Sequence, residues 1–302
     1  MLKHVDDLKN LVKKSKKYNL VVVFAHDEYV IDAVAKAVNF GVINPILIGD
    51  QPVIEDLCHQ YNIEATVIHN TDVIEAPKLA MDLVNQGKAD IIMKGLIDTK
   101  YLLKAVVSNE YGIKAKSLLS HIGLVSVPGM NRVLFATDGA MMIEPTVLEK
   151  IGLVENAADL LKSLGYDEPK IGIVSSVEKV NPKIKSTVDA KEIVDYFKDK
   201  QVSFLIDGPF AIDNLVSIES VKHKNIESPV AGLADVLVFP NLDGGNIFYK
   251  TAVFLAKGDS AGIVMGAKVP IIVTSRADTM NAKLNSILLA VVNLDGILAS
   301  RH

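Results

Sequence analysis

The sequence has no tryptophan and only one cysteine among its 302 residues. A single cysteine cannot form an internal disulfide, and it cannot build a cysteine-based zinc site alone. The net charge is −4 at pH 7, so the chain has no overall basic excess with which to bind duplex nucleic acid. The longest apolar runs are shorter than the ~20 residues of a membrane helix, and residues 1–10 lack the apolar core of a secretory signal. We therefore expect a cytoplasmic protein with no nucleic-acid partner and no membrane partner.

Several familiar ligand-binding motifs are also missing. There is no G-x-x-x-x-G-K-[ST] sequence and no G-x-G-x-x-G sequence, which removes the P-loop and disfavours a dinucleotide site of the Rossmann type. The seven histidines show no spacing typical of a metal site. Cys58 and His59 are adjacent on a predicted helix, so their side chains should point apart, and Cys58 is expected to be a core residue. We expect no metal and no tightly bound cofactor.

What the chain does have is a repeated order of short apolar runs and helical segments. Residues 20–25 (LVVVFA) form a continuous β-branched run, typical of a strand buried on both faces of a parallel sheet. The short turn at 129–131 predicts an antiparallel hairpin. Further strands are predicted at 45–49, 65–68, 89–93, 121–128, 132–137, 170–175, 202–206, 236–239, 262–265 and 270–274. Helices are predicted at 30–37, 53–61, 76–85, 99–107, 146–164, 186–198, 246–256 and 280–292.

This alternation predicts an α/β fold, in which a mainly parallel sheet is flanked by helices. A length of 302 residues corresponds to two domains at roughly 150 residues each. Because no linker rich in proline or glycine separates them, the two lobes should share a large interface, and the chain should cross between them more than once. The first crossing is expected near residues 139–146.

The turns that follow predicted strands are the expected place for a site, because open parallel sheets bind ligands beyond the carboxyl ends of their strands. One turn places Lys94 and Gly95 directly after a strand, with Thr99 able to cap the next helix. Another places Ser275 beside Arg276, whose guanidinium could bind a phosphate through two hydrogen bonds. Both turns therefore favour an anionic ligand.

The same charges have a second interpretation. Arg276 could pair with Asp278, and Lys94 with Asp98, as solvated ion pairs of the kind that contribute little stability. Residues 241–246 (NLDGGN) alone are typical of a helix cap. Beside a phosphate they would form an anion-binding site at the start of a helix, and Lys250 lies one turn into that helix. The local sequence leaves these alternatives open.

Five segments, taken in order, carry a resemblance to a known family. They are 94–99 (KGLIDT), 207–209 (DGP), 234–241 (ADVLVFPN), 245–250 (GNIFYK) and 274–278 (TSRAD), the last followed by Lys283 and 285–287 (NSI). With them the whole chain resembles the phosphate acetyl/butyryltransferase family, and segments 93–95 and 275–278 are closer to its butyryl branch. The resemblance implies an acyltransferase that moves a short-chain acyl group between coenzyme A and inorganic phosphate. The expected acyl group is butyryl.

The resemblance further implies that coenzyme A is a co-substrate, whose thiolate attacks the acyl phosphate directly in a ternary complex. The implied partners are acyl-CoA, acyl phosphate and inorganic phosphate, together with further copies of the chain in a dimer or larger homo-oligomer. The implied fold is similar to that of isocitrate dehydrogenase, with two lobes and the active site in the cleft between them. Since the last strand and helix then return to the first lobe, residues 1–140 and 273–302 are assigned to the first lobe and 141–272 to the second.

The resemblance also implies roles for individual residues. Ser275 and Arg276 match the phosphate-binding pair, and Asp278 is expected to act as the base or to orient Arg276. At the position of Ala282, the acetyl branch carries an aspartate that is a candidate for the general base. The identity of the base in this chain is therefore open. Lys283 could instead stabilise the thiolate. The expected substrate-binding residues are Lys94, Gly95, Thr99, Lys104, Asn246, Lys250 and Lys283.

Two basic residues are candidates for further phosphate contacts, Lys104 on the helix after the Lys94 turn and, more weakly, Arg132 in the hairpin. Two other functions also fit part of the pattern. Ala282 is compatible with a paralogue that binds coenzyme A or acyl phosphate without turnover. A nicotinamide-dependent dehydrogenase of the same fold would need a metal site of clustered aspartates, and the sequence shows no such grouping.

Overall fold

The computed structural model describes residues 2–13, 16–275 and 278–300 and divides them into two compact units. Unit 1 comprises residues 2–5 and 120–259, and unit 2 comprises residues 6–119 and 260–300. Both crossings fall earlier than the predicted 140 and 273. The first is earlier because the hairpin strand that ends at Thr137 pairs with a strand of unit 1, Val236–Val238, and so belongs to that sheet. The N-terminal segment joins unit 1 as well, since the Leu2 amide donates to the Tyr166 hydroxyl and the Leu2 carbonyl accepts from Val133.

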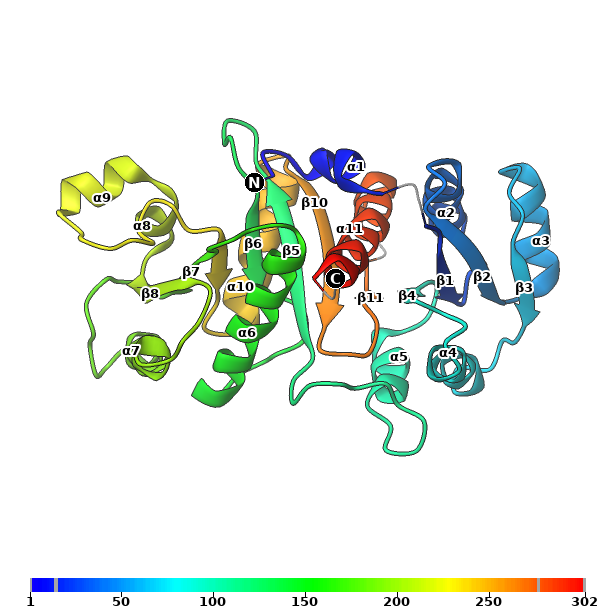
Figure 1. The fold of residues 1–302 in the computed structure, drawn as a ribbon, viewed down its shortest axis with the longest axis horizontal. Coiled ribbons are helices and arrows are strands. Elements are labelled where there is room, and N and C mark those ends of the chain that lie inside the picture. Colours follow the sequence, from blue (N-terminus) through cyan, green and yellow to red (C-terminus); the bar gives the residue numbers. More distant parts are fainter. Residues whose placement is uncertain (1, 14–15, 276–277, 301–302) are drawn as a thin grey trace. The chain divides into compact units, whose positions relative to one another are not determined.

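Unit 2 contains a mainly parallel sheet with the strand order β3-β2-β1-β4-β11-β10. Strand β1 pairs in parallel with β2 and β4, β2 with β3, and β4 with β11, whereas β10 is antiparallel to β11. The carboxyl ends of these five parallel strands therefore lie at one edge of the sheet. Figure 1 labels the strands of this unit. The strands are β1 (Tyr18–Val23), β2 (Ile43–Gly49), β3 (Thr66–His69), β4 (Ile91–Lys94), β10 (Asp259–Met265) and β11 (Ile271–Ile272).

Burial explains why the first strand has no polar alternation. Residues 20–23 of β1 are fully buried, so helices must cover both faces of the sheet at this strand. The helices of unit 2 are α1 (Leu8–Leu11), α2 (Glu28–Asn39), α3 (Gln51–Gln60), α4 (Glu75–Asn85), α5 (Thr99–Val106) and α11 (Met280–Ala299), and a 3-10 turn (Val5–Asp7) precedes α1. Helix α11 is long and apolar enough to cross a membrane by length and composition, but 72% of its most apolar window is buried inside the protein, as in a core helix.

Unit 1 contains five strands in the order β5-β6-β9-β7-β8. Strands β5 (Ser120–Ser126) and β6 (Leu134–Thr137) are antiparallel, which confirms the predicted hairpin. Strands β9 (Val236–Val238), β7 (Lys170–Val174) and β8 (Leu205–Phe210) extend the sheet in parallel. The longer helices are α6 (Val147–Ser163), α7 (Lys185–Lys198) and α10 (Leu242–Lys250), which continues into a π-helical segment, Thr251–Leu255.

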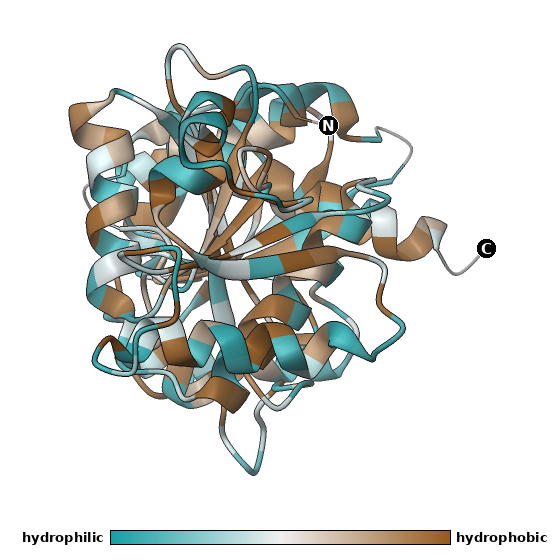
Figure 2. Cartoon of the chain, turned by 90° about the vertical axis from the view of Figure 1, so that its left-hand side faces the viewer, coloured by the Kyte–Doolittle hydropathy of each residue, from teal (hydrophilic) through white to brown (hydrophobic). Residues whose placement is uncertain are grey.

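Two short helices of unit 1 escaped the sequence pattern. Helix α8 (Ile212–Val216) has five residues and α9 (Ile218–Lys224) has seven, and α9 buries none of them, so neither produces a clear apolar stripe. The longer helices that cover the sheets carry hydrophobic and hydrophilic stretches side by side (Figure 2). Strand β8 begins three residues later than the predicted 202, because Val202 is 38% exposed and lies outside the core.

Candidate active site

Three neighbouring strands of unit 2 end at the same place. In the parallel ladder Val23 of β1 pairs with Lys94 of β4, and Ile272 of β11 pairs with Met93. The turns that follow β1, β4 and β11 therefore lie beside one another at the carboxyl edge of the sheet. This is the edge where open α/β sheets bind ligands, and it holds both basic turns that the sequence singled out.

The turn after β4 is packed directly against the end of β1. The Gly95 amide donates to the Val23 carbonyl and the Leu96 amide to the Phe24 carbonyl, each at 2.8 Å. Phe24 has a φ of 62°, in the left-handed region, at the point where β1 ends. A Cβ atom on Gly95 would lie 2.7 Å from the Phe24 carbonyl carbon, closer than real Cβ atoms approach. Gly95 is thus required for this close approach of two chain segments.

Lys94 is buried in its own turn. The residue is only 6% exposed. Its Nζ donates to the Gly95 carbonyl at 3.2 Å and to the Ile97 carbonyl at 3.0 Å. The interpretation of Lys94 as a solvated loop ion is therefore wrong. A buried ammonium group that donates to main-chain carbonyls fixes the shape of the turn and places a positive charge at the carboxyl edge of the sheet.

The turn after β11 is closed by two reciprocal hydrogen bonds. The Ser275 amide donates to Asp278 Oδ2 at 2.7 Å, and the Asp278 amide donates to the Ser275 carbonyl at 3.2 Å. Ser275 itself is exposed. Arg276, the predicted partner of Ser275, lies outside the described residues. The Asp278 carboxylate thus holds the main chain on which Ser275 stands.

Lys283 contacts the same turn from the first turns of α11. The residue is 3% exposed, and Nζ donates to the Ser275 carbonyl at 3.0 Å and towards the Asp278 carbonyl at 3.4 Å. Burial lowers the pKa of Lys283, and the nearby carboxylates of Asp278 and Asp27 oppose that shift. Lys283 therefore adds a second buried ammonium group at the carboxyl edge of the sheet, on the turn after β11.

The structure also locates Asp27 and Ala282. Asp27 Oδ1 accepts from the Val30 amide at 2.9 Å and so caps α2. Its place directly after the first strand could have suggested this role, but its proximity to Lys283 could not be inferred from the sequence. Ala282 is 5% exposed, and its amide donates to the hydroxyl of Thr279, the N-cap of α11. The position that carries a candidate base in the acetyl branch is thus a buried, capped helix position in this chain.

Two predicted site residues, Thr99 and Lys104, lie on α5. Asp98, not Thr99, occupies the N-cap position, and it makes no side-chain cap hydrogen bond, so the predicted capping role of Thr99 is wrong. Thr99 is instead the first helical residue. Lys104 is exposed in the last turn of α5, about 8 Å farther along the helix axis than Thr99 at 1.5 Å per residue.

The remaining predicted residues lie in unit 1. Asn241 Oδ1 accepts from the Gly244 amide at 3.0 Å, which confirms that residues 241–246 form a helix cap. Asn246 Nδ2 donates to the Gly139 carbonyl at 2.9 Å, and so ties α10 to the turn after β6. Lys250 is exposed, and its Nζ lies 5.9 Å from the centre of the Phe254 ring. A ligand role for Asn246 and Lys250 stays a prediction.

Arg132 has a structural position in unit 1. Its guanidinium donates to the carbonyls of Val216 at 3.1 Å and Gly232 at 3.0 Å. Burial lowers the pKa of Arg132, and Asp235 opposes that shift. Two of its donors are thus already engaged with the main chain around α8 and α9.

Asp138 is a buried acidic residue in the turn after β6. The residue is 1% exposed, and its carboxylate accepts from the amides of His121 at 2.8 Å and of Ala140 and Met141 at 2.7 Å. These three bonds fix the turn after β6, against which α10 packs. Among the described residues, no group of three or more histidine, cysteine, aspartate or glutamate side chains is arranged to hold a metal.

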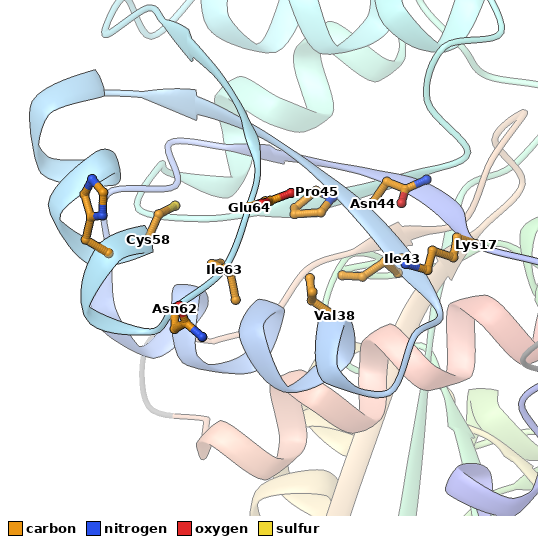
Figure 3. A pocket seen from close by; sticks show the side chains of 10 residues that line it. Lys17, Val38, Ile43, Asn44, Pro45, Cys58, Asn62, Ile63 and Glu64 are labelled. Atoms are coloured by element: carbon orange, nitrogen blue, oxygen red, sulfur yellow. The ribbon is translucent and has the colours of Figure 1, made fainter.

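A hollow of about 570 Å³ lies elsewhere in unit 2, at the amino end of β2 (Figure 3). Cys58 and Ile43 line it, together with Lys17, Val38, Asn44, Pro45, His59, Asn62, Ile63 and Glu64. Cys58 is 8% exposed, as predicted for a core residue, and burial raises the pKa of its thiol. The hollow is at the opposite edge of the sheet from the two basic turns, so it is not part of the candidate active site.

Comparisons with known proteins agree on one family. The sequence pattern of the family described as Phosphate acetyl/butaryl transferase matches residues 68–291. The phosphate butyryltransferase of Clostridium beijerinckii is 35% identical over 97% of this chain and 98% of its own length. The phosphate acetyltransferase of Thermotoga maritima is 36% identical over 92% of this chain and 96% of its own length. A crystal structure of a branched-chain phosphotransacylase from Enterococcus faecalis V583 is 32% identical, with a TM-score of 0.84 over 92% of this chain and 99% of that one.

Proposed function

Because the chain belongs to the phosphate acetyl/butaryl transferase family, we propose that it transfers a short-chain acyl group between coenzyme A and inorganic phosphate. The predicted resemblance to this family and the predicted α/β fold class are confirmed. The protein is a phosphate acyltransferase with coenzyme A as its co-substrate. The observation that carries the proposal within the structure is a pair of buried ammonium groups at neighbouring strands: Lys94 ends β4, and Lys283 of α11 contacts the turn after β11.

The proposed reaction is direct. In one direction the coenzyme A thiolate attacks the carbonyl carbon of the acyl phosphate, a C–S bond forms, and the bond between that carbon and the phosphate oxygen breaks. Inorganic phosphate leaves with the electron pair of the broken bond, and the thiol proton is released to a base or to water. A thiol with a pKa near 8.5 is only a few per cent thiolate at pH 7, so positive charge near the sulfur favours the reaction.

The chain's own residues would act mainly on the phosphate. Ser275 and Arg276 are proposed to bind the phosphoryl group, and Asp278 to position them, because its Oδ2 accepts from the Ser275 amide at 2.7 Å. Negative charge accumulates on the leaving phosphate in the transition state. Buried cations that are already in place stabilise such charge more than solvated ones do, which is the role proposed for Lys94 and Lys283.

Asp278 is less suited to act as the base that deprotonates the thiol. One carboxylate oxygen already accepts from the main chain of its own turn, and the Lys283 ammonium lies next to the same turn. We therefore propose a positioning role for Asp278, with the positive field of the site lowering the thiol pKa. The remaining contacts assigned to Gly95, Thr99, Lys104, Asn246 and Lys250 are part of the same proposal.

The acyl group is proposed to be butyryl, on the basis of the sequence forms at 93–95 and 275–278. The near-equal identities to a butyryl enzyme and an acetyl enzyme, 35% and 36%, do not favour either substrate. One methylene changes binding by only ~1–3 kcal/mol, so a graded preference is expected rather than an absolute one. The protein is further proposed to work in the cytoplasm as a dimer or larger assembly of identical chains.

The test is a thiol-release assay with coenzyme A thioesters from acetyl to hexanoyl. We expect release of free coenzyme A that requires inorganic phosphate and is fastest with butyryl-CoA. Absence of phosphate-dependent release with every thioester would refute the proposal. Calorimetric binding of coenzyme A without any turnover would instead support a binding paralogue, and titration with NADH tests the dehydrogenase alternative.

A further inference from the structure

Lys283 is a buried cation without a directly bonded carboxylate among the described residues. Its Nζ donates to the Ser275 carbonyl at 3.0 Å and towards the Asp278 carbonyl at 3.4 Å, and it forms no ion pair with any residue that the structure describes. A peptide carbonyl carries only a partial charge, so these contacts do not neutralise an ammonium group. Burial without a counter-ion favours the neutral amine. The proposed reaction therefore needs a group that favours the charged form.

The carboxylate of Asp27 is placed to do this. Asp27 directly precedes α2, and Lys283 is the fourth residue of α11. Both helices begin at the carboxyl edge of the sheet and pack against each other, so the N-cap of α2 lies close to the first turn of α11. Asp27 Oδ1 accepts from the Val30 amide at 2.9 Å, which fixes the carboxylate. Burial lowers the pKa of Lys283, and the negative charges of Asp278 and Asp27 oppose that shift.

Asp278 is the other carboxylate that favours the charged form of Lys283. It belongs to the turn after β11 itself, since its Oδ2 accepts from the Ser275 amide at 2.7 Å. Charged and titratable groups on the other elements around Lys283 have contacts of their own. Lys9 pairs with Asp6, Asp32 pairs with Lys36, Glu28 accepts from the Tyr61 hydroxyl, Asp295 accepts from the Tyr18 hydroxyl, His26 accepts from the Asp50 amide, and Lys94 donates to its own turn. Asp27 thus acts on Lys283 from outside the turn that is proposed to hold the phosphate.

The turn after β11 does not itself require the charge. A neutral lysine side chain keeps two N–H groups, enough for the Ser275 and Asp278 carbonyls, whereas an ammonium group has three. Loss of the proton would therefore leave both hydrogen bonds and remove only the positive charge and one donor. The charge matters instead for the reaction, because negative charge accumulates on the phosphate in the transition state. A group that controls the protonation of Lys283 therefore affects the rate more than the fold.

We propose that Asp27 is a positioning residue for acyl transfer, whose carboxylate keeps Lys283 in the ammonium form. In this role Asp27 does not touch the substrate and acts through Lys283. The inference rests on the proposed function, in which the Lys283 charge stabilises the leaving phosphate. It adds to that site a residue that follows β1, whereas the two basic turns follow β4 and β11.

The first test is Asp27→Asn. Asparagine caps helices as well as aspartate does, so this change keeps the bond to the Val30 amide and removes only the charge. The measurement is kcat for phosphate-dependent thiol release from butyryl-CoA, from neutral to alkaline pH. We expect kcat within about twofold of the wild type at neutral pH and about tenfold lower on the alkaline side, where the variant loses the Lys283 proton at lower pH. Ionisation of the substrates is the same for both proteins and cancels in the comparison.

Two control variants separate charge from capping. Asp50→Asn removes the same charge from the N-cap of α3, which makes no side-chain cap hydrogen bond, and should leave the pH profile unchanged. Asp27→Glu keeps the charge but places at the N-cap a residue that is not preferred there, so stability should fall while the alkaline side of the profile stays as in the wild type. A wild-type profile in Asp27→Asn, or the same change of profile in Asp50→Asn, overturns the inference.

A second measurement does not depend on turnover. Unfolding in urea is compared for Asp27→Asn in the wild type and in Lys283→Met, which isolates the coupling of the two side chains. In the wild type the carboxylate stabilises only the ammonium form. The loss caused by Asp27→Asn should therefore be about tenfold in the unfolding equilibrium constant near neutral pH, and it should shrink as pH rises and Lys283 loses its proton.

In the Lys283→Met protein, Asp27→Asn should have no pH-dependent effect over the same range. Equal losses in both backgrounds overturn the inference. If the wild type releases no thiol from any thioester, the proposed function fails, and the urea comparison still decides whether the charges of Asp27 and Lys283 are coupled.

Discussion

Replacement of Lys283 by methionine tests the central element of the site. The wild-type ammonium is buried and donates to the Ser275 carbonyl at 3.0 Å and towards the Asp278 carbonyl at 3.4 Å. Methionine fills similar space but leaves both carbonyls without this donor. A buried polar group without a partner costs about 1–3 kcal/mol, and the methionine avoids the burial of a charge. We therefore expect the free energy of unfolding to fall by only about 1–3 kcal/mol.

Activity should fall much further than stability. A displacement of about 1 Å at the turn that carries Ser275 can reduce the rate about 10²-fold. We expect kcat for phosphate-dependent thiol release to fall by about that factor, with the protein still folded at the assay temperature. The matched control is Lys88→Met, which changes an exposed lysine of unit 2 that forms no ion pair with a described residue. Wild-type kcat and stability in Lys283→Met would refute the role proposed for Lys283.

The pH dependence of stability gives an independent readout for Lys283. Its pKa is lowered in the folded protein, so the unfolded chain binds more protons between that lowered pKa and the unfolded value of about 10.4. The free energy of unfolding contributed by Lys283 therefore rises with pH across this window. We expect the stability difference between wild type and Lys283→Met to grow as pH rises towards 10.4. A difference that does not change with pH in urea titrations would contradict the burial of the charged group.

Three further predictions concern the turns. Arg276→Ala should lower the rate of acyl transfer about 10²–10³-fold, as expected for loss of one charged contact to the phosphoryl group, measured by thiol release. Asp278→Asn keeps an oxygen that can accept from the Ser275 amide, so kcat should fall by less than about tenfold, whereas loss of a catalytic base would cost about 10²–10⁴-fold. Gly95→Ala should destabilise unit 2 by at least about 2 kcal/mol in urea unfolding, because the new methyl group would overlap the main chain at Phe24.

Each of these predictions has a control or a contradicting result. A wild-type rate in Arg276→Ala would refute the assignment of the phosphate site to the turn after β11. Equal, large losses in Asp278→Asn and Asp278→Ala would identify Asp278 as the base. For Gly95→Ala the control is Gly244→Ala in α10, where a new Cβ atom would come no closer than 3.4 Å to its neighbours and stability should not fall. Similar stability losses at both glycines would refute the close approach inferred at Gly95.

Much of the fold could be predicted from local sequence. The β-branched run at 20–25 and the regular return of apolar segments identified the buried strands, because a parallel strand covered on both faces must be apolar throughout. The hairpin turn was equally clear. The short helices α8 and α9 were missed, since helices of five and seven residues with little buried surface leave no periodic pattern. The unit boundaries were misplaced because strand pairing, a long-range contact, decides which sheet the hairpin joins.

The candidate site residues at the strand ends could also be predicted from the sequence. Each of them follows an apolar run: Lys94, Gly95, Ser275 and Asp278. What these residues do depends on neighbours far away along the chain. Only the tertiary structure shows that Lys94 is buried, that Gly95 touches the end of β1, and that Lys283 contacts the turn after β11. The reason is physical: a residue's type sets which bonds it can make, but burial and distance set which of them form, and both depend on packing between segments that the sequence keeps apart.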